Sequence, residues 1–243
     1  MNNVLFNADV GEETGVDDQI MPYISWCNIA CGSHAGSEKE IEKTIQLAIK
    51  HNVKIGAHPS YPDRSNFGRK VMSLPYEDLV QSLTEQLKVV NYYIEKNGET
   101  LHHVKPHGAL YNEAISNQEV AQAIYESIKN TGKKPIVLTL KNSKLADVCK
   151  NEFEVCYEAF ADRMYTNDLS LVSRDNEQAV LKSAEEVFEH VYKMVAKNKV
   201  KTVGKEELPI VFDTICVHGD HPNSVAILTH LHARLKDLNY DIG

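Results

Sequence analysis

The hydrophobic positions of the chain alternate between two patterns. Short apolar runs rich in β-branched residues, bounded by turn-forming residues, predict seven strands. These are VLFNAD (4–9), YISWCNIA (23–30), VKIGAH (53–58), LHHVK (101–105), PIVLTL (135–140), FEVCYEAF (153–160) and IVFDTICVH (210–218). Between the runs, apolar residues recur at the three- and four-residue spacing of helices.

Capping residues and breakers mark where these helices start and stop. The predicted helices begin after Ser37, where Glu40 would complete a capping box, at Pro75, after Asn117, near Val180 and at Pro222. Gly98 suits the position just beyond the second predicted helix. The apolar residues of the fourth predicted helix, which begins near Val180, extend as far as Val195. The polar segment 164–176 is predicted to be a surface loop.

Repeated strand-then-helix units predict an α/β fold with a parallel sheet, because each right-handed crossover needs a covering helix. Two architectures fit, an open doubly wound sheet and a closed barrel. Seven units favour an incomplete or distorted barrel. Since no Pro/Gly/Ser-rich linker divides the chain, residues 1–243 are predicted to form one domain.

Charge and cysteine content narrow the class of protein. The net charge of −8 argues against nucleic acid as a partner, because nothing offsets phosphate repulsion. No apolar run approaches the roughly 18 residues of a membrane helix, and the acidic start of the chain does not resemble a signal peptide. Five cysteines, an odd number, fall in strand-like contexts, which favours reduced thiols and a cytoplasmic location.

The candidate chemistry lies just past the ends of the predicted strands. Six of the seven runs end in a polar cluster, including NADVGE, GAHPSYPD and KPHGALYN. In a parallel barrel all these ends share one face, where active sites form, whereas in an open sheet they would meet only at a switch point. One pocket is therefore expected to hold Asp9, His34, His58, Lys105, His107, Asp162, Arg163 and His218. Each cluster taken alone would also suit an ordinary turn.

The sequence gives weaker evidence for a cysteine site, a metal site or a phosphate-binding site. The spacing of CNIAC is not that of a CxxC pair, so Cys27, Cys31, Cys149, Cys156 and Cys216 are interpreted as core residues. A histidine–carboxylate metal site is open, with Asp9, His34 and His58 as candidates, although no HExxH pair occurs. No phosphate-binding glycine loop is present. His102 and His103 lie inside a strand, where packing is the expected role.

Seven segments together resemble the LamB/YcsF family along nearly the whole chain. They are NADVGE, NIACGSHAG, GAHPSYPD, FGRK, HVKPHGALYN, FADRMY and DTICVHGD. The chain differs from the usual family pattern at Ser33 and Ser37, which flank HAG, and in the short stretch GEETGVDD. The resemblance implies a seven-stranded β/α barrel of the glycoside hydrolase/deacetylase type.

The resemblance also implies the role of the A subunit in an ATP-dependent 5-oxoprolinase, which cleaves 5-oxo-L-proline to L-glutamate with ATP hydrolysis. Two partner subunits, B and C, are implied with it, and ATP would bind with their help. A lactam is a stable amide, and phosphorylation of the amide oxygen by ATP would make it easier to hydrolyse.

Roles for individual residues follow as hypotheses from this chemistry. Asp9 is the candidate general base or metal ligand, and Lys105 the anchor for an anionic group. His107 and His218 are acid/base candidates, because an imidazole pKa of roughly 6.5 suits proton transfer in both directions. Arg69 and Arg163 would clamp the substrate carboxylate, with an Arg163–Asp162 ion pair as the alternative. His34, His58 and Asp162 complete the expected substrate site.

Two rival functions stay open at this level. One is a non-catalytic subunit that holds 5-oxoproline while the partner subunits perform the phosphoryl chemistry. The other is a stand-alone metal-dependent deacetylase or hydrolase with the same barrel.

Overall fold

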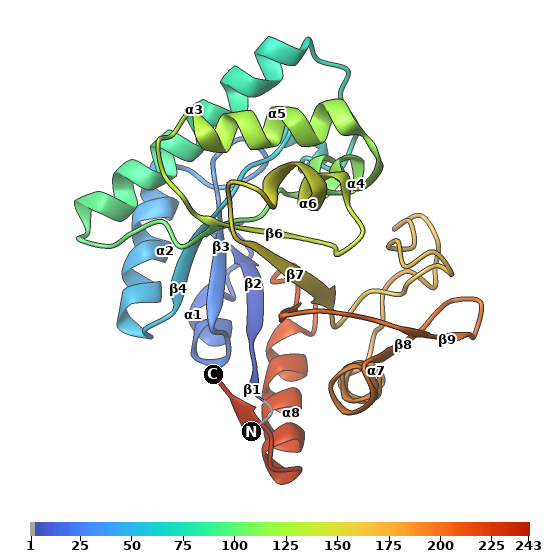
Figure 1. Cartoon of the computed structure of the whole chain (residues 1–243). Coiled ribbons are helices and arrows are strands. Elements are labelled where there is room, and N and C mark those ends of the chain that lie inside the picture. Colours follow the sequence, from blue (N-terminus) through green and yellow to red (C-terminus); the bar gives the residue numbers. More distant parts are fainter. Residues whose placement is uncertain (1–2) are drawn as a thin grey trace.

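A computed structural model describes residues 3–243 (Figure 1). Its seven main strands close into a parallel barrel in the order β10-β2-β3-β4-β5-β6-β7. The barrel strands are β2 (Phe6–Val10), β3 (Trp26–Ala30), β4 (Lys54–His58), β5 (His103–Val104), β6 (Ile136–Thr139), β7 (Val155–Phe160) and β10 (Thr214–Cys216). The closed barrel is confirmed and the open sheet is excluded.

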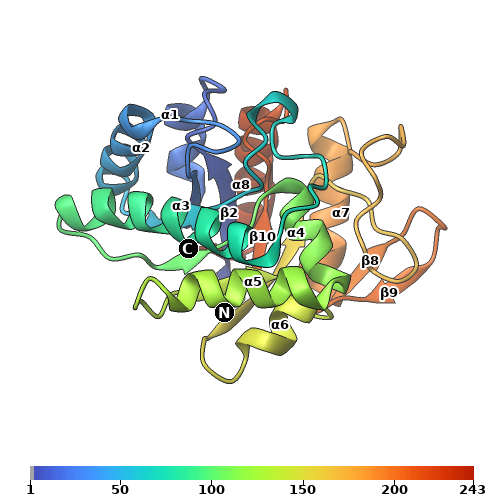
Figure 2. The ribbon, with the colours of Figure 1, turned by 90° about the horizontal axis from the view of Figure 1, so that it is seen from above.

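Helices surround this barrel. They are α1 (Asp17–Ile20), α2 (Glu38–Lys50), α3 (Tyr76–Lys96), α4 (Gly108–Ser116), α5 (Gln118–Lys129), α6 (Lys144–Cys149), α7 (Ala184–Lys197) and α8 (Ser224–Asp237), with 3-10 turns η1 (Met21–Tyr23) and η2 (Arg64–Asn66). Seen from above, α2 and α7 lie on opposite sides of the barrel (Figure 2). The leucine and isoleucine stripe of α3 is buried, which is why a long helix forms there.

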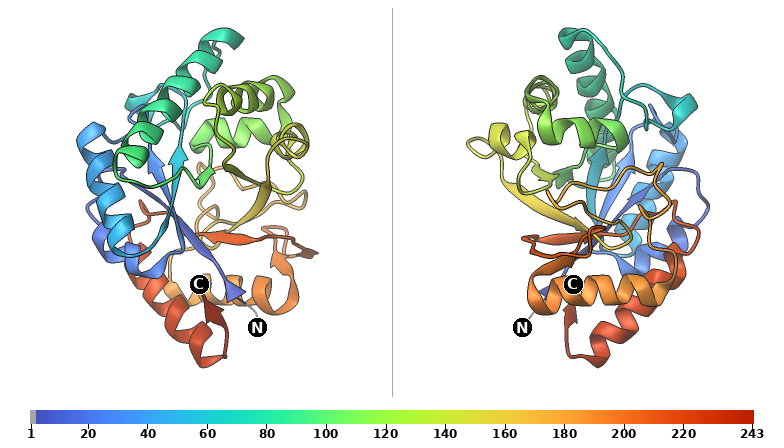
Figure 3. Two further views of the ribbon diagram at one scale, coloured as in Figure 1. Left: turned by 60° about the vertical axis from the view of Figure 1, so that its left-hand side comes forward. Right: turned by 90° about the vertical axis from the view of Figure 1, so that its right-hand side faces the viewer.

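Two small sheets lie outside the barrel. The hairpin β8 (Lys199–Lys201) with β9 (Glu207–Pro209) projects beside α7, and β1 (Asn3–Val4) pairs in parallel with β11 (Asp241–Ile242). The last pairing places the two ends of the described chain side by side (Figure 3).

Most predicted helix starts are close to the observed ones. Asn117 caps α5 by accepting from the N–H groups of Glu119 and Val120. Ser37 caps α2, but only half of the predicted capping box forms, because the Glu40 carboxylate pairs with Lys43 instead. Such caps satisfy N–H groups that have no partner inside the helix.

Other predicted boundaries were wrong. Val180 lies outside α7 and bridges to Arg163, because Ser183 forms a full capping box that starts the helix at Ala184. The short helices α4 and α6 were missed, since each contributes too few turns for a periodic signal. Segment 164–176 was wrongly assigned to the surface as a whole, because Tyr165 is fully buried and Leu171 to Arg174 line the main cavity.

The interior of the barrel is unusually polar. Asn28 donates to Asn7 and Asp9 at 2.8 Å each, and it accepts from His103 Nε2 at 2.7 Å. Gly56 lies beside the His103 ring, and a Cβ atom there would collide with that ring. His103 therefore faces inward, and it holds Asn28 in place rather than filling apolar space as a packing role would predict.

Candidate functional site

The stretch after β5 alternates between the inside and outside of the barrel. Lys105 and His107 donate their main-chain N–H groups to Ala57 and Pro59, so the strand pairing continues past β5. Pro106, between them, needs no such partner because it has no N–H. Residues two apart share a face, so both side chains point to the barrel mouth. Gly108 then turns the chain with φ of +54°, and a Cβ there would lie 2.6 Å from the Gly68 carbonyl oxygen.

Lys105 lies at the floor of this mouth in an almost fully buried cluster. Its Nζ donates to Asp9 Oδ1 at 3.0 Å and lies 3.1 Å from Cys216 Sγ. Glu158 Oε1 is a further 3.0 Å neighbour, without the angles of an aligned hydrogen bond. Side-chain exposure is 3% for Lys105 and 0% for Glu158, so water screens neither charge.

These neighbours fix the charge states in the cluster. Burial alone would lower the pKa of Lys105, but Asp9, Cys216 and Glu158 together outweigh burial and raise the pKa well above its usual value. Burial alone would raise the pKa of Asp9, but His58 and Lys105 hold it well below its usual value. Burial does raise the pKa of Glu158 despite the attraction of Lys105. The pair Lys105–Asp9 is thus a fixed ammonium–carboxylate pair.

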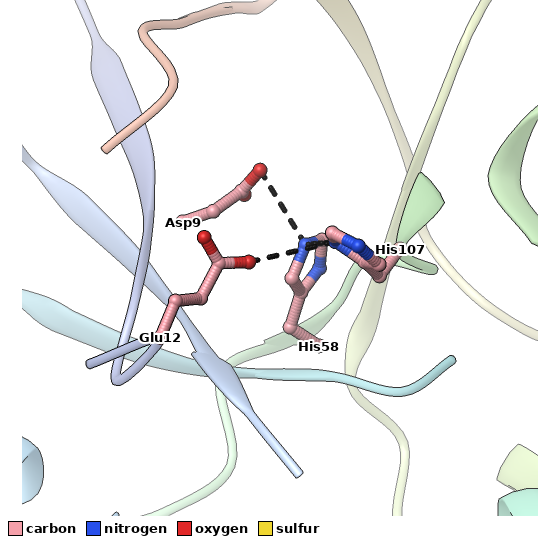
Figure 4. A group of neighbouring side chains, drawn as sticks. All are labelled: Asp9, Glu12, His58 and His107. Atoms are coloured by element: carbon pink, nitrogen blue, oxygen red, sulfur yellow. Dashed lines mark hydrogen bonds and ion pairs between the residues drawn. The ribbon is translucent and has the colours of Figure 1, made fainter. Parts of the chain in front are cut away.

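A second cluster of side chains stands next to Asp9 (Figure 4). His58 Nε2 lies 3.4 Å from Asp9 Oδ2 and 2.9 Å from His107 Nδ1, and His107 Nδ1 lies 3.5 Å from Glu12 Oε1. Burial, followed by the neighbouring His34 and His58, lowers the pKa of His107 well below its usual value. Burial also raises the pKa of Glu12 well above its usual value, and Asp9 adds to that rise.

His34 supports this cluster from behind. Its ring stacks on His107 with centroids 3.8 Å apart, and its Nε2 lies 3.2 Å from Glu12 Oε1. Burial lowers the pKa of His34 to about 3, so the ring is neutral. His34 was expected to line the pocket, but among residues 3–243 it is not part of the cavity wall.

On the other wall, His218 is oriented by a carboxylate. Its Nδ1 lies 2.8 Å from Asp162 Oδ1. Burial would raise the pKa of Asp162, but His218 and its hydrogen bond outweigh burial and hold the pKa at about 2. Because Nδ1 donates to Asp162, the other ring nitrogen of His218 is left to accept a proton, and His218 lines the cavity. Asp162 itself lies behind that wall.

A cavity of about 880 Å³ connects these groups. Asp9, Glu12, His58, Lys105, His107 and His218 line it together with Arg69, Lys70, Arg163 and Arg174. The arginines differ in their freedom to bind a ligand. Arg163 is buried and donates to the carbonyl oxygens of Val172 and Ala179, so it holds the loop, and it forms no ion pair with Asp162 within the described chain. Arg69 pairs with Asp220 at the rim and is half-exposed.

Several residues of the site escaped the sequence reasoning. Glu12, Asn28, Glu158 and Asp220 were not singled out, although each touches a predicted site residue. Glu158 did leave a signal, because a carboxylate in the middle of an apolar strand is costly without a partner. All five cysteines, each inside the described range, are buried free thiols, as expected.

Of the metal candidates, the structure brings together two. Asp9 and His58 form a group with Glu12 and His107 in which one ligand atom from each residue lies within 4.8 Å of the others. His34 is outside that group, and a second group joins Asp9 with Cys216 and His218. Imidazole nitrogens and carboxylate oxygens are the donors that zinc and similar ions accept, so the first group fits a metal ion.

Comparison with known proteins places this geometry in a family. The sequence profile of the LamB/YcsF family matches residues 4–243. A protein named as the A subunit of 5-oxoprolinase from Pyrococcus furiosus is 39% identical over 237 residues, covering 95% of this chain and 93% of that protein. One of the same name from Oceanobacillus iheyensis is 40% identical over 242 residues, covering 97% and 94%.

Solved structures agree with the fold. The crystal structure of a lactam utilization protein from Thermus thermophilus matches with a TM-score of 0.90 at 32% identity, covering 99% of this chain and 98% of that one. A family 4 carbohydrate esterase from Streptomyces lividans matches with a TM-score of 0.54 at 9% identity, covering 100% and 92%, which shows a shared fold alone. No helix within residues 3–243 is long and apolar enough to cross a membrane.

Proposed function

The chain belongs to the LamB/YcsF family, and from that premise we propose that it is the A subunit of an ATP-dependent 5-oxoprolinase. The reaction opens the lactam ring of 5-oxo-L-proline to give L-glutamate while ATP is hydrolysed. One structural observation supports a catalytic role independently of family membership. A buried, permanently cationic lysine and an oriented histidine face the same cavity at the mouth of the barrel.

Lys105 at the floor of the cavity and His218 on its wall have different roles in the reaction. Lys105 faces the position where the lactam oxygen gains negative charge, and a fixed cation in a dry site stabilises such charge strongly. His218 takes a proton from the attacking water and returns one to the ring nitrogen as the C–N bond breaks. Asp162 holds His218 in the tautomer that this transfer needs.

The rim suits the other end of the substrate. 5-Oxoproline carries a carboxylate next to its ring nitrogen. Arg69 and Arg174, which both approach Asp220, supply guanidinium groups at the cavity wall. An arginine fork binds a carboxylate through two hydrogen bonds, so the substrate can take the place of Asp220 as the partner of Arg69.

ATP and partner subunits complete the proposal. The sequence holds no glycine-rich phosphate loop, so ATP binds with the help of subunits B and C. We expect little ATP-dependent glutamate formation by the purified chain alone and full activity after subunits B and C are added. Efficient turnover by the single chain would contradict this division of labour. Unchanged turnover after replacement of both Lys105 and His218 would instead support a non-catalytic binding subunit.

A second candidate is favoured by the histidine–carboxylate group beside Asp9. A stand-alone metal-dependent deacetylase or hydrolase would use such a group to activate water. Metal-dependent release of acetate from acetylated substrates by the single chain, without ATP, would support this candidate over ring opening.

A further inference from the structure

One ring nitrogen of His58 faces one ring nitrogen of His107 at hydrogen-bond distance. His58 Nδ1 lies 2.7 Å from the Lys105 carbonyl oxygen, and His107 Nε2 lies 2.9 Å from the Phe67 carbonyl oxygen. A carbonyl oxygen only accepts, so each of these nitrogens carries a hydrogen. When both rings are neutral, the two remaining nitrogens, 2.9 Å apart, are both acceptors.

Two carboxylate oxygens point at the same place. Asp9 Oδ2 lies 3.4 Å from His58 Nε2, and Glu12 Oε1 lies 3.5 Å from His107 Nδ1 (Figure 4). With both carboxyl groups ionised and both rings neutral, these four atoms are all acceptors, and a cation between them relieves their repulsion. We propose that Asp9, Glu12, His58 and His107 bind one divalent transition-metal ion of the zinc type.

Three separations among the four atoms agree with this proposal, and all four lie within 4.8 Å of one another. Zinc binds nitrogen and oxygen at about 2.0–2.2 Å in a tetrahedron, which places neighbouring ligand atoms about 3.3–3.6 Å apart. The separations of 3.4 and 3.5 Å match that value, and the 2.9 Å gap between the rings needs to widen by only a few tenths of an ångström. Mixed imidazole and carboxylate donors favour zinc-like ions over Mg²⁺ or Ca²⁺.

The surroundings orient every ligand. Both rings donate their outer N–H to a main-chain carbonyl, which is the usual support of a metal-binding histidine. Asp9 receives Lys105 and Asn28 on Oδ1, which leaves Oδ2 for the ion. The His34 ring packs flat on His107 and approaches Glu12 Oε1 at 3.2 Å.

Charge and access also favour a divalent ion. Two buried carboxyl groups, Asp9 and Glu158, lie beside the single ammonium of Lys105, and the buried Glu12 lies beside His107. Burial raises the pKa of Glu12 and of Glu158, and a nearby ion of charge +2 would favour their ionised forms. With all three carboxyl groups ionised, the ion brings the sum of these charges to zero, which lowers the cost of burying them. All four proposed ligands line the open cavity, so an ion can enter and leave.

The test measures metal binding without reference to turnover. Full-length protein stripped with a chelator is titrated with Zn²⁺ and, separately, with Mg²⁺ by calorimetry, and bound metal is counted by elemental analysis. Co²⁺ serves as a spectroscopic probe, because tetrahedral cobalt absorbs visible light strongly. We expect one Zn²⁺ per chain, tetrahedral cobalt bands, and no comparable Mg²⁺ binding.

Variants locate the site. His58→Ala and His107→Ala should each weaken Zn²⁺ binding at least a hundredfold, whereas His230→Ala, a half-exposed position on α8, should leave it unchanged. If circular dichroism shows that the alanine variants do not fold, Zn²⁺ binding by His58→Gln and the number of ions bound per wild-type chain test the proposal instead. Less than one ion per chain, or binding that survives both replacements, would overturn the proposal. Because no turnover is measured, failure of the ring-opening function would leave this result unaffected.

Discussion

Two cation–carboxylate clusters stand at the same end of the barrel in opposite environments. At the floor, Lys105 and its partners Asp9 and Glu158 have side-chain exposures of 3%, 5% and 0%. At the rim, Arg69 and Asp220 are 37% and 20% exposed. The same pairing of charges therefore has two consequences. Burial makes the floor a permanent electrostatic element, whereas water at the rim makes that ion pair weak and exchangeable.

The largest expected effect comes from removing the charge at the floor. Lys105→Met should reduce ATP-dependent glutamate formation, assayed with subunits B and C, at least about a hundredfold, the scale of one lost charge-stabilising contact in a dry site. Circular dichroism checks the fold, because unpaired Asp9 and Glu158 would cost stability. Lys96→Met, which breaks an exposed pair with Glu42, is the matched control and should change little. Near-normal turnover of Lys105→Met would show that the Lys105 cluster is not required for catalysis.

A smaller effect should follow when Lys105 keeps its charge but loses a neighbour. Glu158→Gln preserves the shape of the side chain and removes its carboxylate, so Lys105 is less firmly placed. We expect kcat to fall about tenfold, equivalent to about 1.4 kcal/mol, with KM nearly unchanged. Glu154→Gln, at an exposed position just before β7, should have no effect. A change in KM alone would show that Glu158 acts on substrate binding instead.

At the rim, the effect should appear in KM. Arg69→Ala removes a guanidinium that binds the substrate carboxylate, so KM for 5-oxoproline should rise about tenfold while kcat changes less, the scale of one charge-assisted contact. Arg234→Ala on α8 disrupts an exposed pair with Glu185 of α7 and is the control. If kcat falls and KM stays constant, Arg69 acts on the chemical step, as Lys105 does, and not on substrate binding.

The smallest effect on turnover is expected for a buried titratable group without a charged partner. His190 on α7 is buried with Nε2 unpartnered, and burial lowers its pKa to about 4. Between pH 6.5 and 4 the unfolded chain thus binds more protons than the folded one, so stability falls as pH falls through this range. The loss amounts to about 2 kcal/mol at pH 5.

His190→Gln should remove that acid sensitivity and leave turnover at neutral pH unchanged. Chemical denaturation at a series of pH values measures how the free energy of unfolding depends on pH. His230→Gln is the control, because His230 is partly exposed and paired with Glu185. Equal pH slopes for His190→Gln and the wild type would show that His190 is protonated in the folded state without cost.

The sequence by itself determined the framework. Seven apolar runs became the seven barrel strands, because strand formation depends on local β-branched content and on breakers at the ends. Pro106 and Gly108 set the local path that brings Lys105 and His107 to one face, which period-two alternation and a positive φ require. For that reason six of the eight side chains expected in one pocket from the strand ends do line the cavity.

Only the tertiary structure decided which of these groups meet. Lys105 reaches Asp9 across 96 positions of sequence because β2 and β5 face each other inside a closed barrel. Glu158 became a partner of Lys105 through the register of β7, and the carbonyl oxygens of Lys105 and Phe67 fixed the tautomers of two histidines. Register, closure and desolvation are properties of the whole packed barrel, and no local pattern of residues contains them.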